Sequence, residues 1–161
     1  MAGPVTCDAG PLIAFAWTDC LQLLKQLFGE VWIPPAVRAE CLAGDGIDRE
    51  RIAASLQAGW LRTRAPSAKS TSLSPSLGPG ETEALLLAQE HPKSLLIVDD
   101  RLAWRYALSR DIEIIGTVHL LRAAEREGMI EGAESVVATM RAAGYRISID
   151  LLEQVRQRHQ P

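Results

Sequence analysis

The sequence contains little cysteine and few aromatic residues, and each shortage excludes a class of protein. Only three cysteines occur in 161 residues. An odd number at irregular spacing argues against a disulfide framework, and no CxxC or Cys/His cluster suggests a zinc site. We therefore expect three reduced thiols, mostly buried. Aromatic residues make up only 5% of the chain, so the core is expected to consist mainly of Leu, Ile, Val and Ala.

Long apolar segments and an excess of positive charge are also lacking. No apolar run reaches the roughly 18 residues of a membrane span, and residues 1–4 show no leader pattern, so we expect a cytoplasmic protein that is not in a membrane. The net charge of −3 does not favour a general nucleic-acid binder. Of 17 basic residues only Lys25, Lys69 and Lys93 are lysine. Arginine makes bidentate contacts with phosphate, although a coding bias toward arginine explains the same count.

Short apolar runs alternate with helical patterns along the chain. Strands are expected at residues 5–7, 31–33, 60–64, 94–98 and 112–115, and helices at 12–17, 21–28, 35–43, 49–58, 81–90, 101–109, 118–127, 132–143 and 149–158. Asp19 and Asp48 are expected to cap helices. The alternation predicts an α/β domain with a parallel sheet of four to five strands flanked by helices.

The predicted elements also suggest how the chain is organised. We assign residues 1–130 to the main domain and 131–161 to a C-terminal helical extension packed on it. Residues 65–79 are rich in serine and proline, which predicts a long loop, and loops of this length are usually functional or mobile.

Five acidic residues stand where such a fold would bring them together. Asp8 follows the first strand, and Asp99 and Asp100 follow the most apolar strand, so all three reach the edge where α/β proteins bind ligands. Glu40 lies in the helix after the second strand, and Glu81 opens the helix before the apolar strand. Crowded carboxylates repel one another unless a cation neutralises them, and their oxygens suit Mg²⁺ or Mn²⁺. Such an ion activates water and stabilises charge at a phosphate.

Four of these acids also have a purely structural interpretation. Asp8 and Asp99 are both placed to cap the helix that follows, Glu40 to lie on a solvated helix face, and Glu81 to interact with a helix dipole. No histidine is an obvious general base, and His119 is the nearest.

Ordered motifs along the chain resemble the PIN-domain family, and within it the prokaryotic branch related to VapC-type toxins. The resemblance is carried by residues 5–13 (VTCDAGPLI), 31–40 (VWIPPAVRAE), 77–84 (LGPGETEA), 96–101 (LIVDDR) and 115–130. It covers nearly the whole chain in the right order, and the ordered set is more specific than any one motif. It implies a PIN-like, Rossmannoid sheet.

The resemblance further implies a metal-dependent nuclease that cuts RNA. The implied catalytic acids are Asp8, Glu40, Glu81 and Asp99. The implied metal ligands are Asp8, Glu81, Asp99 and Asp100, and strand register decides which of the two adjacent aspartates faces the metal.

Thr117 and two arginines are the expected substrate-binding residues. Thr117 either bonds a metal-bound water or caps a helix. Arg101 and Arg105 are four residues apart on one helix, where they would meet phosphate or form a solvated face, and Arg105 would alternatively brace an acid. Glu83 is expected to point outward or to support the site from behind.

A basic rim and two tryptophans are further candidates for contact with RNA. Arg62, Arg64 and Lys69 flank the long loop. Trp60 and Trp104 would stack on bases or, as we favour, lie buried in a core or dimer contact.

The resemblance implies partners as well as an activity. Toxins of this family form homodimers and are masked by a small antitoxin protein, and residues 129–140 are our candidate dimer interface. The main alternative is a PIN-fold module that binds RNA or a protein and cleaves weakly or not at all, because Ala9 and Gly10 stand where relatives carry hydroxyl groups. A receiver-type phosphoryl-transfer domain is disfavoured, because the aspartate pair follows a late strand and no lysine follows the last one.

Overall fold

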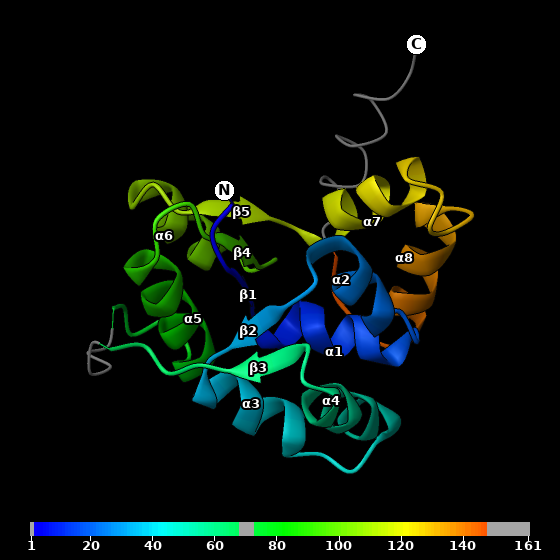
Figure 1. Cartoon of the computed structure of the whole chain (residues 1–161), viewed down its shortest axis with the longest axis horizontal. Coiled ribbons are helices and arrows are strands. Elements are labelled where there is room, and N and C mark those ends of the chain that lie inside the picture. Colours follow the sequence, from blue (N-terminus) through cyan, green and yellow to red (C-terminus); the bar gives the residue numbers. More distant parts are fainter. Residues whose placement is uncertain (1, 68–72, 148–161) are drawn as a thin grey trace.

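A five-stranded parallel sheet covered by helices forms the frame of the molecule (Figure 1). The computed structural model describes residues 2–67 and 73–147. The strands are β1 (Val5–Cys7), β2 (Val31–Ile33), β3 (Leu61–Thr63), β4 (Leu95–Ile97) and β5 (Glu113–Ile115). The helices are α1 (Ala9–Trp17), α2 (Leu21–Phe28), α3 (Pro35–Leu42), α4 (Ile47–Ala58), α5 (Pro79–Glu90), α6 (Arg101–Ser109), α7 (Thr117–Arg126) and α8 (Ala133–Ala142). The predicted fold class is therefore confirmed.

The first strand in the sequence occupies the middle of the sheet, whose order is β3-β2-β1-β4-β5. Thr6 of β1 is opposite Trp32 on one side and Leu96 on the other. Helices on both faces bury the central strands, and all three residues of β1 are buried. β1 and β4 run side by side in the same direction, so their carboxyl ends meet at one edge.

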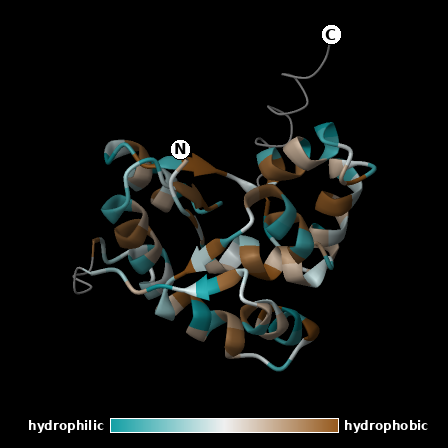
Figure 2. Cartoon of the chain, viewed as in Figure 1, coloured by the Kyte–Doolittle hydropathy of each residue, from teal (hydrophilic) through white to brown (hydrophobic). Residues whose placement is uncertain are grey.

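Two apolar clusters lie on opposite faces of the sheet. The larger one includes Phe15 of α1, Ile97 of β4 and Leu120 of α7. The smaller one includes Leu85 of α5 and Leu96 of β4. Successive strand residues face opposite sides of the sheet, so Leu96 packs in the smaller cluster and the next residue, Ile97, packs in the larger one. In Figure 2 the edge strand β5 is coloured mostly hydrophobic, whereas the opposite edge strand β3 carries hydrophilic residues.

The C-terminal part of the described chain packs on the rest. Helix α8 contacts α7 and α1, and its residues Ala133, Val137 and Met140 belong to the larger cluster. The domain boundary at residue 130 stays a prediction, and the helix expected at 149–158 lies outside the described residues. Within the described residues, no helix is both long and apolar enough to cross a membrane.

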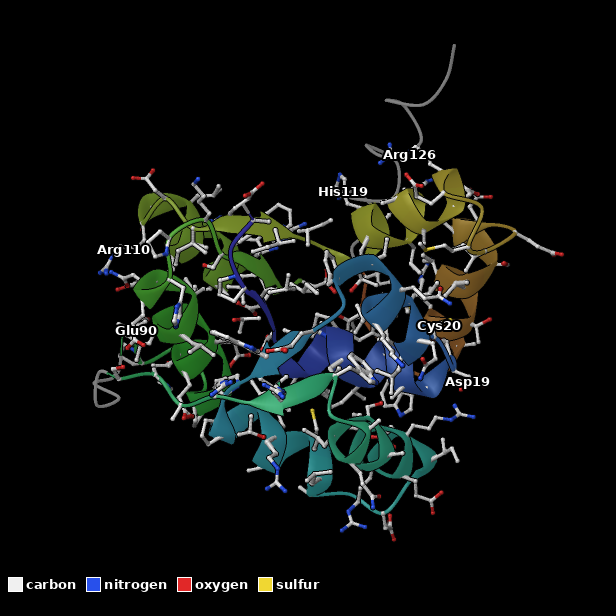
Figure 3. All side chains as sticks on the ribbon, viewed as in Figure 1. Asp19, Cys20, Glu90, Arg110, His119 and Arg126 are labelled. Carbon is white, nitrogen blue, oxygen red and sulfur yellow. The ribbon has the colours of Figure 1, made fainter. Side chains whose placement is uncertain are left out.

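Two of the predicted helix caps are wrong. The N-cap of α2 is Cys20, whereas Asp19 adopts a φ of 55° and lies 3.6 Å from Arg51 Nε at the junction of α1 and α2 (Figure 3). The N-cap of α4 is Gly46, and Asp48 lies inside the first turn, where its charge favours the helix dipole. In both cases the acid interacts with a charge or dipole close to the helix start instead of capping it.

Four helices begin earlier than predicted, among them α4 at Ile47 rather than residue 49 and α7 at Thr117 rather than residue 118. The other two, α1 and α5, do so because their first turns tolerate Gly and Pro. Helix α1 starts at Ala9 rather than at residue 12, and α5 starts at Pro79 rather than at residue 81. The first backbone N–H groups of a helix have no partner within it, so a proline there loses no hydrogen bond. All three cysteines are free, and Cys7 and Cys41 are buried, as expected.

Candidate active site

Strand alternation distributes the predicted acids between the two faces of the sheet. The backbone N–H of Asp8 donates to Ile97 O at 2.9 Å, which places Asp8 beside the end of β4. Alternate residues of an extended chain face the same side of the sheet. Asp100 therefore shares the side of Leu96, which faces α5, whereas Asp99 shares the side of Ile97, which faces the larger cluster. The two adjacent aspartates therefore have different surroundings.

Gly80, in the first turn of α5, marks the place where Asp8 and Glu40 approach each other. A Cβ atom at Gly80 would lie 3.1 Å from Glu40 Oε2 and 3.8 Å from Asp8 Oδ1. Two carboxylates from α3 and the end of β1 thus lie over a backbone position that has no side chain. Glu81 follows directly in the same turn and is half-buried.

Asp8 is the most buried of these acids, with 5% of its surface exposed. Burial, and then the negative charges of Glu81, Glu40 and Asp100, raise the pKa of Asp8 from 3.8 to about 7, against a backbone hydrogen bond from Ala9 that lowers it. Burial and the charge of Glu81 also raise the pKa of Glu40. Asp8, Glu40, Glu81 and Asp100 therefore form one group of interacting negative charges, which we call the acidic cluster.

Glu83 ties together the two helices that carry Glu40 and Glu81. Its Oε2 accepts a hydrogen bond of 3.0 Å from the backbone N–H of Ala36, in the first turn of α3. An acid at this end of a helix also interacts favourably with the helix dipole. Glu83 is therefore turned inward to α3, in a supporting role.

Asp99 is held by residues from two other segments. Its Oδ1 accepts from the backbone N–H of Thr117 at 2.8 Å, and its Oδ2 accepts from Thr117 Oγ1 at 2.5 Å and from the Tyr145 hydroxyl. Thr117 is fully buried at the start of α7, whose N-cap is Gly116. The alternative role of Thr117 as an N-cap is therefore wrong, because its hydroxyl bonds Asp99.

Asp100, not Asp99, caps the following helix. The side chain of Asp100 accepts from the backbone N–H of Ala103 at 2.8 Å and is exposed. Asp8 precedes α1 at the N-cap position, but its side chain makes no capping hydrogen bond. The capping interpretation is thus wrong for Asp99, whereas Asp8 has the position of a cap without its bond.

The cysteines close to these acids are poor nucleophiles. Burial, followed by the charges of Asp8 and Asp99 among others, raises the pKa of the Cys7 thiol well above its ordinary value. Burial and the charge of Glu40 likewise raise the pKa of Cys41 to about 12. Both thiols stay protonated at neutral pH, and a thiol is a much weaker nucleophile than a thiolate.

The predicted substrate-binding arginines are exposed on α6. Arg101 and Arg105 both lie on the surface directly after Asp100. Of the predicted rim, Arg62 lies 3.9 Å from Glu30 and Arg64 stacks over Trp32, whereas Lys69 lies outside the described residues. Rim residues Arg62 and Arg64 thus interact within the protein.

Neither tryptophan offered for base stacking is exposed. Trp60 is 5% exposed, and Trp104 is half-buried and donates from Nε1 to Val98 O at 2.6 Å. The burial that we favoured is confirmed for Trp60, whereas Trp104 is only partly buried, against the smaller cluster.

His119 lines a cavity that is separate from the acidic cluster. A cavity of about 410 Å³ is lined by Trp104, Glu113, Gly116 and His119, among others, between β5 and α7. His119 and Arg126 are both on this side of α7 (Figure 3). None of the predicted acids lines this cavity, so the cavity is a feature of the β5 edge rather than of the acidic cluster.

Tyr145 is the site residue that the sequence did not indicate. It lies beyond α8, 46 positions from Asp99, and no motif links it to the acids. Only the packing of α8 on α1 and α7 brings it to the end of β4. For Glu83 the sequence left open an outward position or a supporting role; its acceptance of a hydrogen bond from Ala36 N–H of α3 agrees with the supporting role.

The chemistry of the cluster fits a hard divalent cation. It supplies carboxylate oxygens, which Mg²⁺ and Mn²⁺ prefer, and two of them meet over the open backbone position of Gly80. In the described part of the chain, no three Asp, Glu, His or Cys side chains form a ready-made metal-binding group. Ligation would therefore require side-chain rotations within the cluster.

Comparisons with known proteins agree with this architecture. The pattern of the DUF3368 family, described as a PIN domain, matches residues 4–161. The chain belongs to the PIN-domain family. No curated protein is similar enough to count as a match.

A solved structure supports the same fold. A PilT N-terminus domain protein from the hyperthermophilic archaeon Sulfolobus solfataricus P2 superposes with a TM-score of 0.53 at 20% sequence identity. The match covers 74% of this chain and 92% of the archaeal one. The PIN domain is generally a nuclease fold, so nuclease chemistry is the class to test first.

Proposed function

We propose that the chain is a PIN-type endoribonuclease that uses Mg²⁺ or Mn²⁺ to hydrolyse phosphodiester bonds in RNA. The observation that carries the proposal is the acidic cluster around Asp8. A buried carboxylate surrounded by other acids opposes folding unless a cation offsets the repulsion. The preference for RNA rests on the family resemblance.

In this proposal three acids of the cluster bind the cation and the fourth lies next to them. Asp8, Glu40 and Glu81 would hold the cation, and Asp100 would add negative charge beside them. Such an ion supplies Lewis-acid chemistry, which activates a water and stabilises charge on phosphate. Asp99, which Thr117 holds at the end of β4, would add a carboxylate to this ligand set, as the family resemblance implies.

The arginines of α6 are proposed to bind the substrate backbone. Arg101 and Arg105 lie on the exposed surface next to Asp100, and guanidinium groups bind phosphate through paired hydrogen bonds. Their positive charge would also reduce the repulsion between RNA and the acidic cluster.

A toxin role, an antitoxin and a homodimer complete the proposal and rest on the resemblance. A basic side chain of a small antitoxin protein would match the charge of the cluster. Of the candidate dimer interface at residues 129–140, Met129 is 38% exposed, whereas Met140 is fully buried within its own protomer. Only part of that segment is thus available for a dimer contact.

The binding-module alternative is favoured by the start of α1. Ala9 is buried and Gly10 has no side chain, so neither contributes a polar group beside Asp8. A PIN fold with this sequence would hold RNA without cutting it if a missing hydroxyl limited catalysis.

Cleavage of a labelled single-stranded RNA tests the proposal. Wild-type protein is compared with Asp8→Asn and with Asp45→Asn, which changes an exposed aspartate outside the cluster, in Mn²⁺, Mg²⁺ and EDTA. We expect metal-dependent cleavage that Asp8→Asn lowers by more than about 100-fold and that Asp45→Asn leaves unchanged. RNA binding without cleavage would support the binding module, and equal cleavage by all three proteins would reject the site.

A further inference from the structure

The segment after α8 places an aromatic hydroxyl between the start of α1 and the end of β4. The phenol of Tyr145 donates a hydrogen bond to Asp99 Oδ2. The same side chain faces Gly10, because a Cβ atom there would lie 3.5 Å from both Tyr145 Cε2 and Tyr145 Oη. Tyr145 therefore fills the space into which a side chain at residue 10 would project.

The hydrogen bonds of Asp99 explain what this phenol does locally. A carboxylate offers about four acceptor positions, and Thr117 and Tyr145 together occupy three of those of Asp99. Donors from α7 and from the segment after α8 thus fix both oxygens.

The hydrogen bonds of Thr117 and Tyr145 to Asp99 lie in a region that is largely shielded from solvent. Thr117 is fully buried and Tyr145 is half-buried. Burial and the neighbouring charge of Asp99 also raise the pKa of the Tyr145 hydroxyl, so the phenol remains a donor at neutral pH.

We propose that Tyr145 is a positioning residue of the nuclease site, which holds the Asp99 carboxylate against Thr117 and so makes the segment after α8 part of the site. This inference rests on the proposed function. It implies that the site draws on both ends of the described chain, through Gly10 and Tyr145.

A second tyrosine provides a matched control. Tyr106 on α6 accepts a 2.5 Å hydrogen bond from Arg110 Nη2, and that guanidinium lies over its ring. This phenol is also engaged, but at the surface and away from Asp99. Tyr145→Phe and Tyr106→Phe each remove one hydroxyl and keep the ring.

The test measures Mn²⁺ affinity by calorimetry and kcat and KM for RNA in Tyr145→Phe, Tyr106→Phe, Asp99→Asn and the Asp99→Asn/Tyr145→Phe double variant. We expect Tyr145→Phe to lower kcat or Mn²⁺ affinity about 10-fold to 100-fold with little change in KM or melting temperature. Tyr106→Phe should match the wild type. The double variant should be no worse than Asp99→Asn alone, because both changes act through one contact.

Three results would overturn the proposal. Wild-type behaviour of Tyr145→Phe would mean that the hydrogen bond has no role, and a rise in kcat would mean that it restrains Asp99 unproductively. Equal losses in both tyrosine variants would indicate general destabilisation. If the wild type cuts no RNA, the proposed function fails, but Mn²⁺ affinity across the four variants still tests whether Tyr145 and Asp99 act as a pair.

Discussion

Asp8 shows at the scale of a single residue how a site acid affects folding. It is buried beside β4, and this burial, together with the charges of the surrounding acids, raises its pKa to about 7. The unfolded chain carries the same group with an ordinary pKa of 3.8. The folded state therefore binds a proton at Asp8 more tightly than the unfolded state does, and ionisation of Asp8 opposes folding.

This difference predicts the pH dependence of stability in EDTA. Because the folded-state pKa is the higher one, the contribution of Asp8 is fully present below about pH 4 and is lost as the pH rises through about 7. Asp8→Asn should remove this dependence and stabilise the protein at pH 8 by on the order of 4 kcal/mol. Urea unfolding from pH 4 to 8, with Asp45→Asn as control, measures it. If the free energy of unfolding of Asp8→Asn depends on pH as steeply as that of the wild type, Asp8 is not the titrating group.

The sequence identified the acids better than it identified their partners. Asp8, Glu40 and Glu81 could be predicted because each stands at the end of a strand or near one in the chain order of an α/β fold. The different surroundings of Asp99 and Asp100 required the β1–β4 register, which sequence alone does not supply. Tyr145 could not be predicted, because its contact depends on how α8 packs.

At the scale of elements, α3 and α5 act as a pair that presents Glu40 and Glu81. The hydrogen bond that Ala36 N–H in the first turn of α3 donates to Glu83 in the second turn of α5 joins the two helices. The open backbone at Gly80 lets them approach, since a Cβ there would come within 3.4 Å of Val37 Cγ2. The relative position of Glu40 and Glu81 thus depends on the Glu83 side chain and on the absence of a side chain at Gly80.

Removal of this connection should weaken both the fold and the site. Glu83→Ala leaves the N–H of Ala36 without its acceptor and should destabilise the protein by about 1–2 kcal/mol, with weaker Mn²⁺ binding. Glu83→Gln keeps an acceptor oxygen and should lose less. Thermal unfolding and calorimetry of both variants provide the comparison. Equal behaviour of Ala and Gln would show that the charge of Glu83, rather than its hydrogen bond, matters.

The elements themselves followed from simple patterns, with errors at their ends. The apolar run at residues 94–98 predicted a central strand, and β4 is found there. The caps at Asp19 and Asp48 were wrong because an acid near a helix start has other stable uses, such as the contact of Asp19 with Arg51. Local preference sets the type of an element more firmly than its first residue.

For the whole molecule, the repulsion within the acidic cluster links folding to cation binding. A ligand that binds only the folded state stabilises it by about 2.7 kcal/mol at 100 times its Kd. For a chain of this size we expect Mn²⁺ at that excess to raise Tm by about 5–10 °C. Scanning calorimetry of the wild type and Asp8→Asn checks this. A similar shift in Asp8→Asn would place the bound ion outside the cluster.

The position of β1 in the sheet has a consequence for synthesis on the ribosome. β1 emerges before the other strands, yet one of its two neighbours is β4. The pairing of Val5 with Leu95 therefore cannot form until β4 has been made. Chains emerge from the N-terminus at a limited rate, and Asp8 and Glu40 are made long before Asp99. A nascent chain therefore carries Asp8 and Glu40 before β4 is available to pair with β1.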